Sequence, residues 1–387
     1  MNPLPHEAFL TALASLDGVG PGRLRWMLSH GSPEHVWELV RAGTLRGAPA
    51  HLALDTTVLR SWVSQTGSID PADCWRRCRS LGVGVMSLGS ASYPQALAED
   101  IDPPVVLFHQ GDPDLLDARR VAIVGTRRAT GYGIRSAEQL GSDLADAGVV
   151  VVSGLALGID AAAHRGALAG GSTCPGVVAV VGGGLDAPCP ARNRQLARSI
   201  IERGVIFSEV PPGVPAAPWR FPVRNRVLAA LADAVIVVES AGAGGSMHTV
   251  REAMSRDRPV LAVPGPIDSR ASEGTNRLIS EGAIPCLGVE DVFTAMGKVG
   301  PVERSVRRVG AVDPRDEPVG DAVTVLEAIG WRPVSVEEVA IRSGLDLGPL
   351  SLALGELDQA GWTTRTGGWI ERRARPEGVR PTAPPGA

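Results

Sequence analysis

The chain has 387 residues, of which 44% are apolar and 21% charged, so it resembles an ordinary soluble globular protein with room for two or three domains. No apolar run approaches the roughly 18 residues of a membrane span, and Met1–Phe9 carries an acid but no basic segment, so we expect a cytoplasmic protein without membrane insertion. A net charge of −4 excludes general attraction to polyanions, so nucleic-acid binding would need a local basic patch.

Cysteine and lysine usage limits the kinds of binding site that the chain can form. The five cysteines are odd in number and scattered along the chain: Cys74, Cys78, Cys174, Cys189 and Cys286. The closest two, Cys74 and Cys78, are accompanied by neither a histidine nor a second cysteine pair. We expect buried or half-buried thiols, with no metal site, disulfide or cofactor. Lys298 is the only lysine, so the positive charge is almost entirely arginine, the better bidentate ligand for phosphate.

Residues 1–80 are predicted to form a helical domain. Pro5–Leu39 contains two helix-like segments joined by the glycine turn Gly18–Gly22, a pattern similar to a helix-hairpin-helix. Such a turn either brings backbone amides close to a phosphate or serves only packing, and the sequence leaves both interpretations open.

Residues 81–298 are predicted to form a doubly wound α/β domain with a lead-in strand at Val105–Phe108. Apolar runs without polar alternation, typical of parallel strands buried on both faces, occur at Val121–Val124, Val149–Val152, Val177–Val181 and Ala234–Val238. Helix-length amphipathic segments lie between or after them, at Ile134–Ala147, Ala161–Ala169, Arg192–Arg203 and Met247–Arg256. Ligands of such Rossmann-like sheets bind beyond the carboxyl ends of the strands, so the turns that end these runs should share one edge.

The rest of the chain divides into three parts. Residues 299–320 lack periodicity and are predicted to be a linker. Residues 321–372 contain three helix-like segments and a hairpin, a pattern that predicts a winged helix with a capping box at Ser335 and Glu338. The third segment has acidic residues and no basic one, which argues against strong reading of a DNA groove. The proline-rich tail at 373–387 is predicted to be disordered.

The first strand run ends in Gly125, Thr126 and Arg127. Glycine lets the backbone approach a ligand, the hydroxyl and amides can donate to an anion, and the guanidinium can bind phosphate in bidentate fashion. Neither this turn nor Gly131–Gly133 has the G-x-G-x-x-G spacing, and no G-x-x-x-x-G-K-[ST] occurs, so dinucleotide binding and P-loop hydrolysis are disfavoured. The alternative is a structural turn with an exposed arginine.

The second strand run ends in Ser153 and Gly154. Asp160 follows as the expected N-cap of the next helix, and His164 lies one turn further on. No nucleophile accompanies this histidine in the sequence, which favours a structural role or a place beside a bound phosphate.

The sharpest patch gathers basic and aromatic side chains around the start of a helix: Trp219, Arg220, Phe221, Arg224 and Arg226. Guanidinium groups on the backbone with aromatic rings on the bases are how single strands are held. The alternative places Phe221 in the core and lets Arg224 and Arg226 bridge acids such as Glu209 and Glu239. We expect at least one arginine to be structural and at least one to face a ligand.

A last glycine turn, Gly244-Gly245-Ser246, leads into a helix and again suits phosphate. Glu252 lies within that helix, three residues after Thr249, and is either a catalytic carboxylate or a surface charge. The spacing is similar to the P-G-G-x-G-T-x-x-E motif of Lonely Guy-type nucleotide phosphoribohydrolases, which makes such an enzyme the alternative function.

Together these stretches resemble the DprA/Smf family of DNA-processing proteins. The resemblance rests on Val121–Gly133, Ser153–His164, Ser208–Gly213, Phe221–Arg226, Gly245-Ser246, Val263–Gly265, Gly274–Asn276 and Gly282-Ala283. It covers the central domain in order and spacing, and the flanking domains fit the longer members.

The resemblance implies a non-catalytic protein that binds and protects single-stranded DNA, forms a homodimer through its Rossmann-like domain, and loads RecA during natural transformation. Single-strand-binding protein is a further candidate partner. Carried over by position, the strand-binding pocket comprises Gly125, Thr126, Arg127, Ser153, Gly154, Phe221, Arg224 and Ser246, and the patch and glycine turn described above add Arg220, Arg226 and Gly245. We expect Arg127→Ala and Arg224→Ala to weaken single-strand binding while leaving the fold intact.

The chain departs from the family pattern at three places. Pro218 stands where a lysine is common before the Phe-Pro motif, so Arg220 is a candidate substitute for that lysine. Cys189 replaces a usual tyrosine, and Gly-Gly-Ser-Met-His-Thr replaces the commoner Ser-Gly-Ser-Leu-Ile-Thr.

Overall fold

The computed structural model describes residues 3–171, 174–187, 190–242, 244–297, 315, 317–330, 333–366 and 369–373. The chain divides into two compact units, Met1–Gly300 and Pro301–Ala387. Among the described residues, no helix combines the length and apolar character needed to cross a bilayer. Cys189 lies outside the described residues, and the other four cysteines are free thiols, Cys74, Cys78, Cys174 and Cys286.

The first unit begins with helices, three of which start at a side-chain cap. The carboxylates of Asp55 and Asp70 and the hydroxyl of Ser32 accept backbone N–H groups at three helix starts. These helices pack around Trp37 and Trp62, and the Trp62 indole donates to the Asp17 carbonyl at 2.9 Å. The helical elements are α1 (His6–Ser15), α2 (Pro21–Leu28), α3 (Pro33–Arg41), η1 (Ala50–Leu52), α4 (Thr56–Gln65) and α5 (Pro71–Ser80).

A sheet of nine strands follows in the order β1-β2-β6-β5-β4-β3-β7-β8-β9. The pairs β1–β2 and β2–β6 are antiparallel and all other pairs are parallel, which confirms the predicted α/β fold and the attachment of the lead-in strand. The strands are β1 (Gly84–Ser87), β2 (Val106–Gly111), β3 (Arg120–Val124), β4 (Val150–Ser153), β5 (Val177–Val181), β6 (Gly204–Ser208), β7 (Ala234–Val237), β8 (Val260–Ala262) and β9 (Ile284–Pro285).

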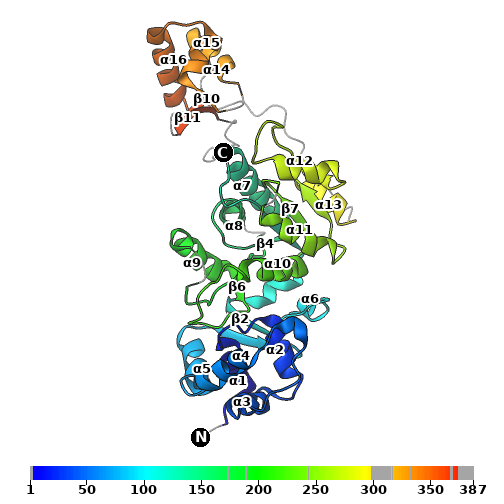
Figure 1. The fold of residues 1–387 in the computed structure, drawn as a ribbon. Helices are drawn as coiled ribbons and strands as arrows, with labels where there is room; N and C mark the ends of the chain where they lie inside the picture. Colours follow the sequence, from blue (N-terminus) through cyan, green and yellow to red (C-terminus); the bar gives the residue numbers. More distant parts are fainter. Residues whose placement is uncertain are drawn as a thin grey trace, which may run out of the picture. The chain divides into compact units, whose positions relative to one another are not determined.

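Helices cover both faces of this sheet (Figure 1). Val121 and Ile123 of β3 face one layer and Ala122 and Val124 face the other, which is why the strand is apolar throughout. The first layer contains α7 (Gly131–Asp146), α8 (Ile159–Ala169), α9 (Arg194–Arg203) and α13 (Val289–Ala295). The second contains α6 (Gln95–Ala98), α10 (Arg220–Leu231), α11 (Ser246–Met254) and α12 (Glu273–Ser280), and short turns occur at η2 (Pro113–Asp117) and η3 (Ala191–Asn193).

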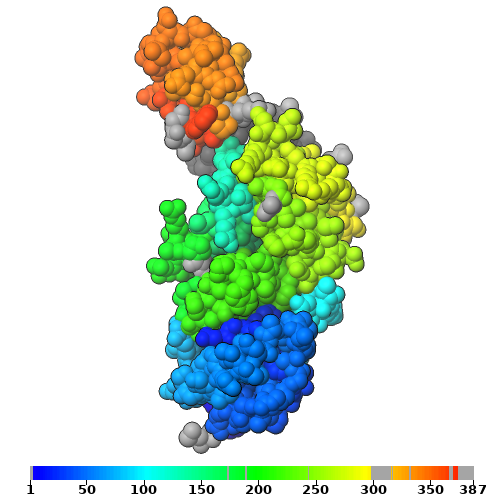
Figure 2. Space-filling model, in the orientation of Figure 1, coloured from blue at the N-terminus to red at the C-terminus, as the bar shows by residue number. Residues whose placement is uncertain are grey.

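The N-terminal helices share a continuous apolar core with the first layer of the sheet domain. In Figure 2 their blue surface directly adjoins the green surface of the sheet domain. The region that the sequence divides near residue 80 therefore packs as one body within the first unit.

The second unit has the elements of a winged helix. The Ser335 hydroxyl caps α15 by accepting the Glu338 N–H at 3.2 Å, but the Glu338 carboxylate pairs with Arg342, so only half of the predicted capping box forms. Most of the predicted linker and all of the tail after Arg373 lie outside the described residues. The elements are α14 (Asp321–Ile329), β10 (Val334–Ser335), α15 (Val336–Ser343), α16 (Leu347–Gln359), β11 (Thr363–Thr366) and β12 (Trp369–Arg372), with the strands ordered β10-β12-β11.

Candidate nucleic-acid interface

A groove of about 580 Å³ lies at the carboxyl end of the parallel strands. It is bounded by the turn after β3, the first turns of α10 and the start of α11. The sequence-predicted residues that line it are Gly125, Thr126, Arg127, Phe221, Arg224, Gly245 and Ser246. A smaller pocket of about 330 Å³ shares Arg127, Phe221 and Arg224 with the groove and is lined also by Gly154. The sheet thus brings together segments that are more than a hundred residues apart in the chain.

Arg127 is an exposed cation of the groove. Its guanidinium carbon lies 4.8 Å from the centroid of the Phe221 ring, which holds the charge over an aromatic face. In the described part of the chain, neither Arg127 nor Arg128 has a carboxylate within ion-pair distance. The N-terminus of α11, which begins at Ser246, adds the partial positive charge of its first turn. The groove therefore offers a guanidinium without a direct carboxylate partner beside an aromatic ring.

Arg224 is a buried cation that lies beneath this groove. Its guanidinium donates to the Val180 carbonyl, and its Nε has no partner among the described residues. A Cβ on Gly154 would collide with the guanidinium, so a larger residue there would displace the end of the Arg224 side chain. Burial lowers the pKa of Arg224 to about 10, so the side chain is still cationic at neutral pH. Because Arg224 is buried, the expectation that Arg224→Ala leaves the fold intact needs correction, since alanine would leave a cavity and an unpaired carbonyl.

Asp160 is not the N-cap that the sequence suggests. Gly158, with φ of +78°, occupies that position, and a Cβ there would collide with the Thr126 carbonyl. Asp160 lies instead within the first turn of α8, where its carboxylate accepts the Ala156 N–H at 3.4 Å. Burial raises the pKa of Asp160, and the nearby charge of Arg224 opposes that shift. Asp160 therefore serves as the buried counter-charge nearest to Arg224.

His164 is fully buried in α8, and neither ring nitrogen has a partner among the described residues. Burial and the charge of Arg224 lower the pKa of His164 to about 3. The ring is therefore neutral at physiological pH and lies outside the groove lining, which fits the structural alternative rather than direct phosphate contact.

We expect His164 to make the sheet domain less stable in acid. An unfolded histidine binds its proton near pH 6.5, whereas the folded one resists it down to about pH 3, so the unfolded state binds more protons between these values. The free energy of unfolding should therefore fall by up to about 1.4 kcal/mol per pH unit as the pH drops below 6.5. Urea unfolding at several pH values checks this, and His164→Leu should flatten the slope. An unchanged slope in that variant would contradict the assignment.

Three predicted site residues line neither the groove nor the smaller pocket. Arg226 is buried and forms ion pairs with Glu209 and with Asp102, the latter at 3.1 Å, because it leaves α10 on another face. Ser153 is fully buried, and its hydroxyl donates to the Ile123 carbonyl at 2.6 Å. Arg220 donates to the Pro215 carbonyl at 2.6 Å and lines a different cavity. The alternative in which arginine bridges Glu209 is thus correct for Arg226, but Glu239 instead binds Thr130.

Other residues of the groove had weak signals in the sequence. Arg128, Asn225, His248 and Thr249 also line it. Arg128 could have been inferred from its neighbour Arg127, whereas His248 becomes a candidate only once α11 is known to begin at Ser246. Glu252, which the enzymatic alternative needs, does not line the groove and pairs with Arg256 at 2.7 Å. That carboxylate is a helix-surface charge.

The glycine turn between α1 and α2 is a packing device. Arg23 donates to the carbonyls of Gly18, Leu52 and Ala53, so its charge is used within the turn. Gly20 lies against Trp219, close enough that a Cβ would be 3.2 Å from two ring carbons. The packing interpretation therefore fits this turn better than direct phosphate contact.

Comparison with known proteins gives a consistent family. The model for "DNA recombination-mediator protein A" matches residues 84–297, and that for the "DprA winged helix domain" matches residues 310–368. The putative DNA processing protein DprA of Mycobacterium tuberculosis is 41% identical over 281 residues, which is 70% of this chain and 69% of that protein. Protein Smf of Escherichia coli is 34% identical over 318 residues, or 81% of this chain and 83% of that protein.

Solved structures agree with these relatives. DNA processing protein A of Streptococcus pneumoniae superposes with a TM-score of 0.60 and 31% identity, covering 76% of this chain and 98% of that one. A structure that describes the single-stranded DNA binding mode of DNA processing protein A from Helicobacter pylori has a TM-score of 0.50 and 31% identity, covering 55% and 95%. With a family model over more than half its length and these relatives, the chain belongs to the DprA/Smf family of DNA-processing proteins.

Proposed function

We propose that this groove binds single-stranded DNA through its backbone and bases, and that the protein acts as a non-catalytic recombination mediator. The observation that carries the proposal is Arg127, an exposed guanidinium without a carboxylate partner, held over the Phe221 ring in an open groove. A guanidinium for phosphate beside an aromatic ring for a base is the chemistry of sequence-tolerant single-strand binding. The solved structure of DNA processing protein A from Helicobacter pylori, which describes single-stranded DNA binding by that relative, supports the same ligand.

Family membership supports the wider role. We infer that the bound strand is protected and passed to RecA during natural transformation, with single-strand-binding protein as a further partner. This role requires no bond-breaking group, and the one carboxylate that lines the groove among the described residues, Asp160, is buried beside Arg224.

Binding of labelled oligothymidylate across a range of salt concentrations tests the proposal. We expect binding that weakens steeply with salt and depends little on sequence, because backbone contacts dominate. Nucleoside monophosphates serve as the second arm, since the alternative enzyme would release free adenine from AMP. Release of adenine, or failure to bind oligothymidylate at low salt, would overturn the proposal.

We further propose that two copies associate through the edge strand β9. Ile284 in this strand is 39% exposed and Leu287, two residues after the strand, is 81% exposed, so two large aliphatic side chains lie at or near an unpaired strand edge of the described sheet. A two-fold dimer would bury these side chains and would let two grooves bind the same DNA strand.

Leu287→Glu is expected to convert the dimer to a monomer, since a charge would be buried at the interface. Analytical ultracentrifugation measures the change, and Ile101→Glu, at a 70% exposed aliphatic residue elsewhere, is the matched control. A variant at Leu287 that sediments like the parent protein would contradict this interface.

A further inference from the structure

The first turn of α10 carries a second aromatic–arginine pair outside the groove. The Arg220 guanidinium carbon lies 4.9 Å from the centroid of the Trp219 ring, and Arg220 directly precedes the Phe221 that lies beneath Arg127. Trp219 is 45% exposed, an unusual exposure for so large an aromatic residue, whereas Trp62 and Trp37 of the same unit are buried. The Trp219 ring is therefore not needed to fill the core.

The Trp219 ring packs against Gly20 in the turn between α1 and α2. The backbone of Gly20 has φ of −115°, which any residue can adopt, so glycine is not required there for its conformation. A Cβ at this position would lie 3.2 Å from Cη2 and Cζ3 of Trp219. Glycine at position 20 therefore makes room for the indole, and the turn between α1 and α2 becomes its support.

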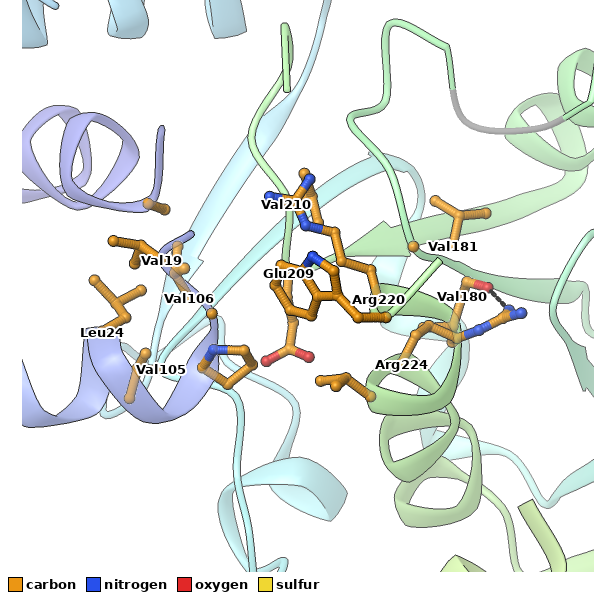
Figure 3. A pocket seen from close by; sticks show the side chains of 16 residues that line it. Val19, Leu24, Val105, Val106, Val180, Val181, Glu209, Val210, Arg220 and Arg224 are labelled. Atoms are coloured by element: carbon orange, nitrogen blue, oxygen red, sulfur yellow. Dashed lines mark hydrogen bonds between the residues drawn. The ribbon is translucent and has the colours of Figure 1, made fainter. Parts of the chain in front are cut away.

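The pair lies next to the groove. A small cavity between the N-terminal helices and α10 is lined by Gly20, Trp219, Arg220 and Arg224, and Arg224 also lines the groove. In Figure 3 the side chains of Arg220 and Arg224 leave α10 in different directions, Arg224 toward the carbonyl of Val180. A strand that leaves the groove over Phe221 can reach Trp219 within the same helical turn.

We propose that Trp219 and Arg220 form a second contact for single-stranded nucleic acid, which extends the bound segment from the groove toward the N-terminal helices. This inference rests on the proposed function of the groove. The indole offers a stacking surface to any base, and Arg220 offers a cation to the adjacent phosphate. The Arg220 guanidinium is already fixed by the Pro215 carbonyl, so it requires little ordering on binding. Arg220 thus contributes to the strand path from outside the groove.

Affinity as a function of oligonucleotide length tests the extension. Trp219→Ala, Trp219→Phe and Arg127→Ala are compared with the parent protein, using full-length chains and oligothymidylates of about 4 to about 16 nucleotides. We expect Trp219→Ala to weaken the longer oligonucleotides about tenfold and to leave the shortest ones unchanged, because the latter fill only the groove. Trp219→Phe should retain most of the affinity, and Arg127→Ala should weaken every length.

The outcomes separate the two proposals. If Trp219→Ala leaves every length unchanged while Arg127→Ala weakens them, the groove binds DNA and the second contact is wrong. Equal loss at short and long lengths would also overturn it, since Trp219 would then act by shaping the groove. If both variants keep the affinity of the parent protein at every length, the proposed function itself is overturned.

A further variant tests the contact at Trp219 without altering a side chain that would face the DNA. Gly20→Val should displace the indole and reproduce the length-dependent loss seen for Trp219→Ala. Photo-crosslinking of oligonucleotides that carry 5-iodouracil supplies a direct readout, with crosslinks expected at Trp219 for nucleotides beyond the groove. Crosslinks confined to the groove residues at all lengths would contradict the extension.

Discussion

Replacing Arg127 with alanine is expected to lower the affinity for single-stranded DNA by about 10- to 100-fold, the effect of losing one charge-assisted contact. The side chain is exposed and contacts only the Phe221 ring among the interactions identified, so its removal should leave the thermal midpoint unchanged. The dependence of binding on salt should become less steep by about one ion. Titration of labelled oligothymidylate at several salt concentrations measures both effects.

The matched control for this variant is Arg165→Ala. Arg165 is an exposed arginine of α8 that pairs with Glu138 at 2.9 Å and does not line the groove. Its removal changes the net charge equally, so it should alter binding only slightly. Equal losses for the two variants would show that overall charge, rather than the groove, governs binding.

Replacing Arg226 with alanine is expected to destabilise the first unit by about 3–5 kcal/mol at alkaline pH, where Glu209 would be left as a buried charge without its partner. The Arg226 and Glu209 side chains are only 7% and 12% exposed. Burial already raises the pKa of Glu209 to about 7 despite the opposing charge of Arg226. Affinity for single-stranded DNA should survive in the folded fraction, since Arg226 lies away from the groove.

The pH dependence of this loss follows from Glu209. Without Arg226 its folded pKa rises further above the unfolded value of 4.5, so the folded state binds more protons over that interval. Relative to the parent protein, the variant should therefore be least destabilised below about pH 7, where Glu209 is protonated in both folded proteins, and most destabilised at high pH. Urea unfolding across pH measures this, with an apolar double replacement, Arg226→Met with Glu209→Leu, expected to recover much of the stability. A loss independent of pH would exclude Glu209 as the cause.

The contrast between Arg224 and Arg226 shows what the sequence could and could not predict. The basic and aromatic patch was recognisable, and helix geometry places position 226 about 200° from position 224. That spacing predicts that 224 and 226 cannot share a site. It does not predict that Arg224 is buried, since burial depends on Gly154, just after β4, and on Val180 in β5.

The parallel strands were predictable because burial on both faces makes them apolar throughout, as in Val177–Val181. The strand β6 was not predicted, since α9 ends at Arg203 and β6 begins at Gly204 without an intervening loop. Asp160 was misassigned for a related reason. A capping residue and a buried counter-charge look alike in sequence, and only the positive φ of Gly158 decides between them.

The side chain of Glu239 has a consequence for how ligands are received. Its carboxylate accepts the Thr130 N–H at 2.9 Å and the Thr130 hydroxyl, and its backbone carbonyl accepts the Thr126 N–H at 2.8 Å. The segment from Thr126 to Thr130, which bears Arg127, is therefore hydrogen-bonded at both ends to Glu239, just after β7. This segment is therefore preorganised, so the entropic cost of binding falls on the nucleic acid. The backbone of the protein should have the same conformation with and without the bound ligand.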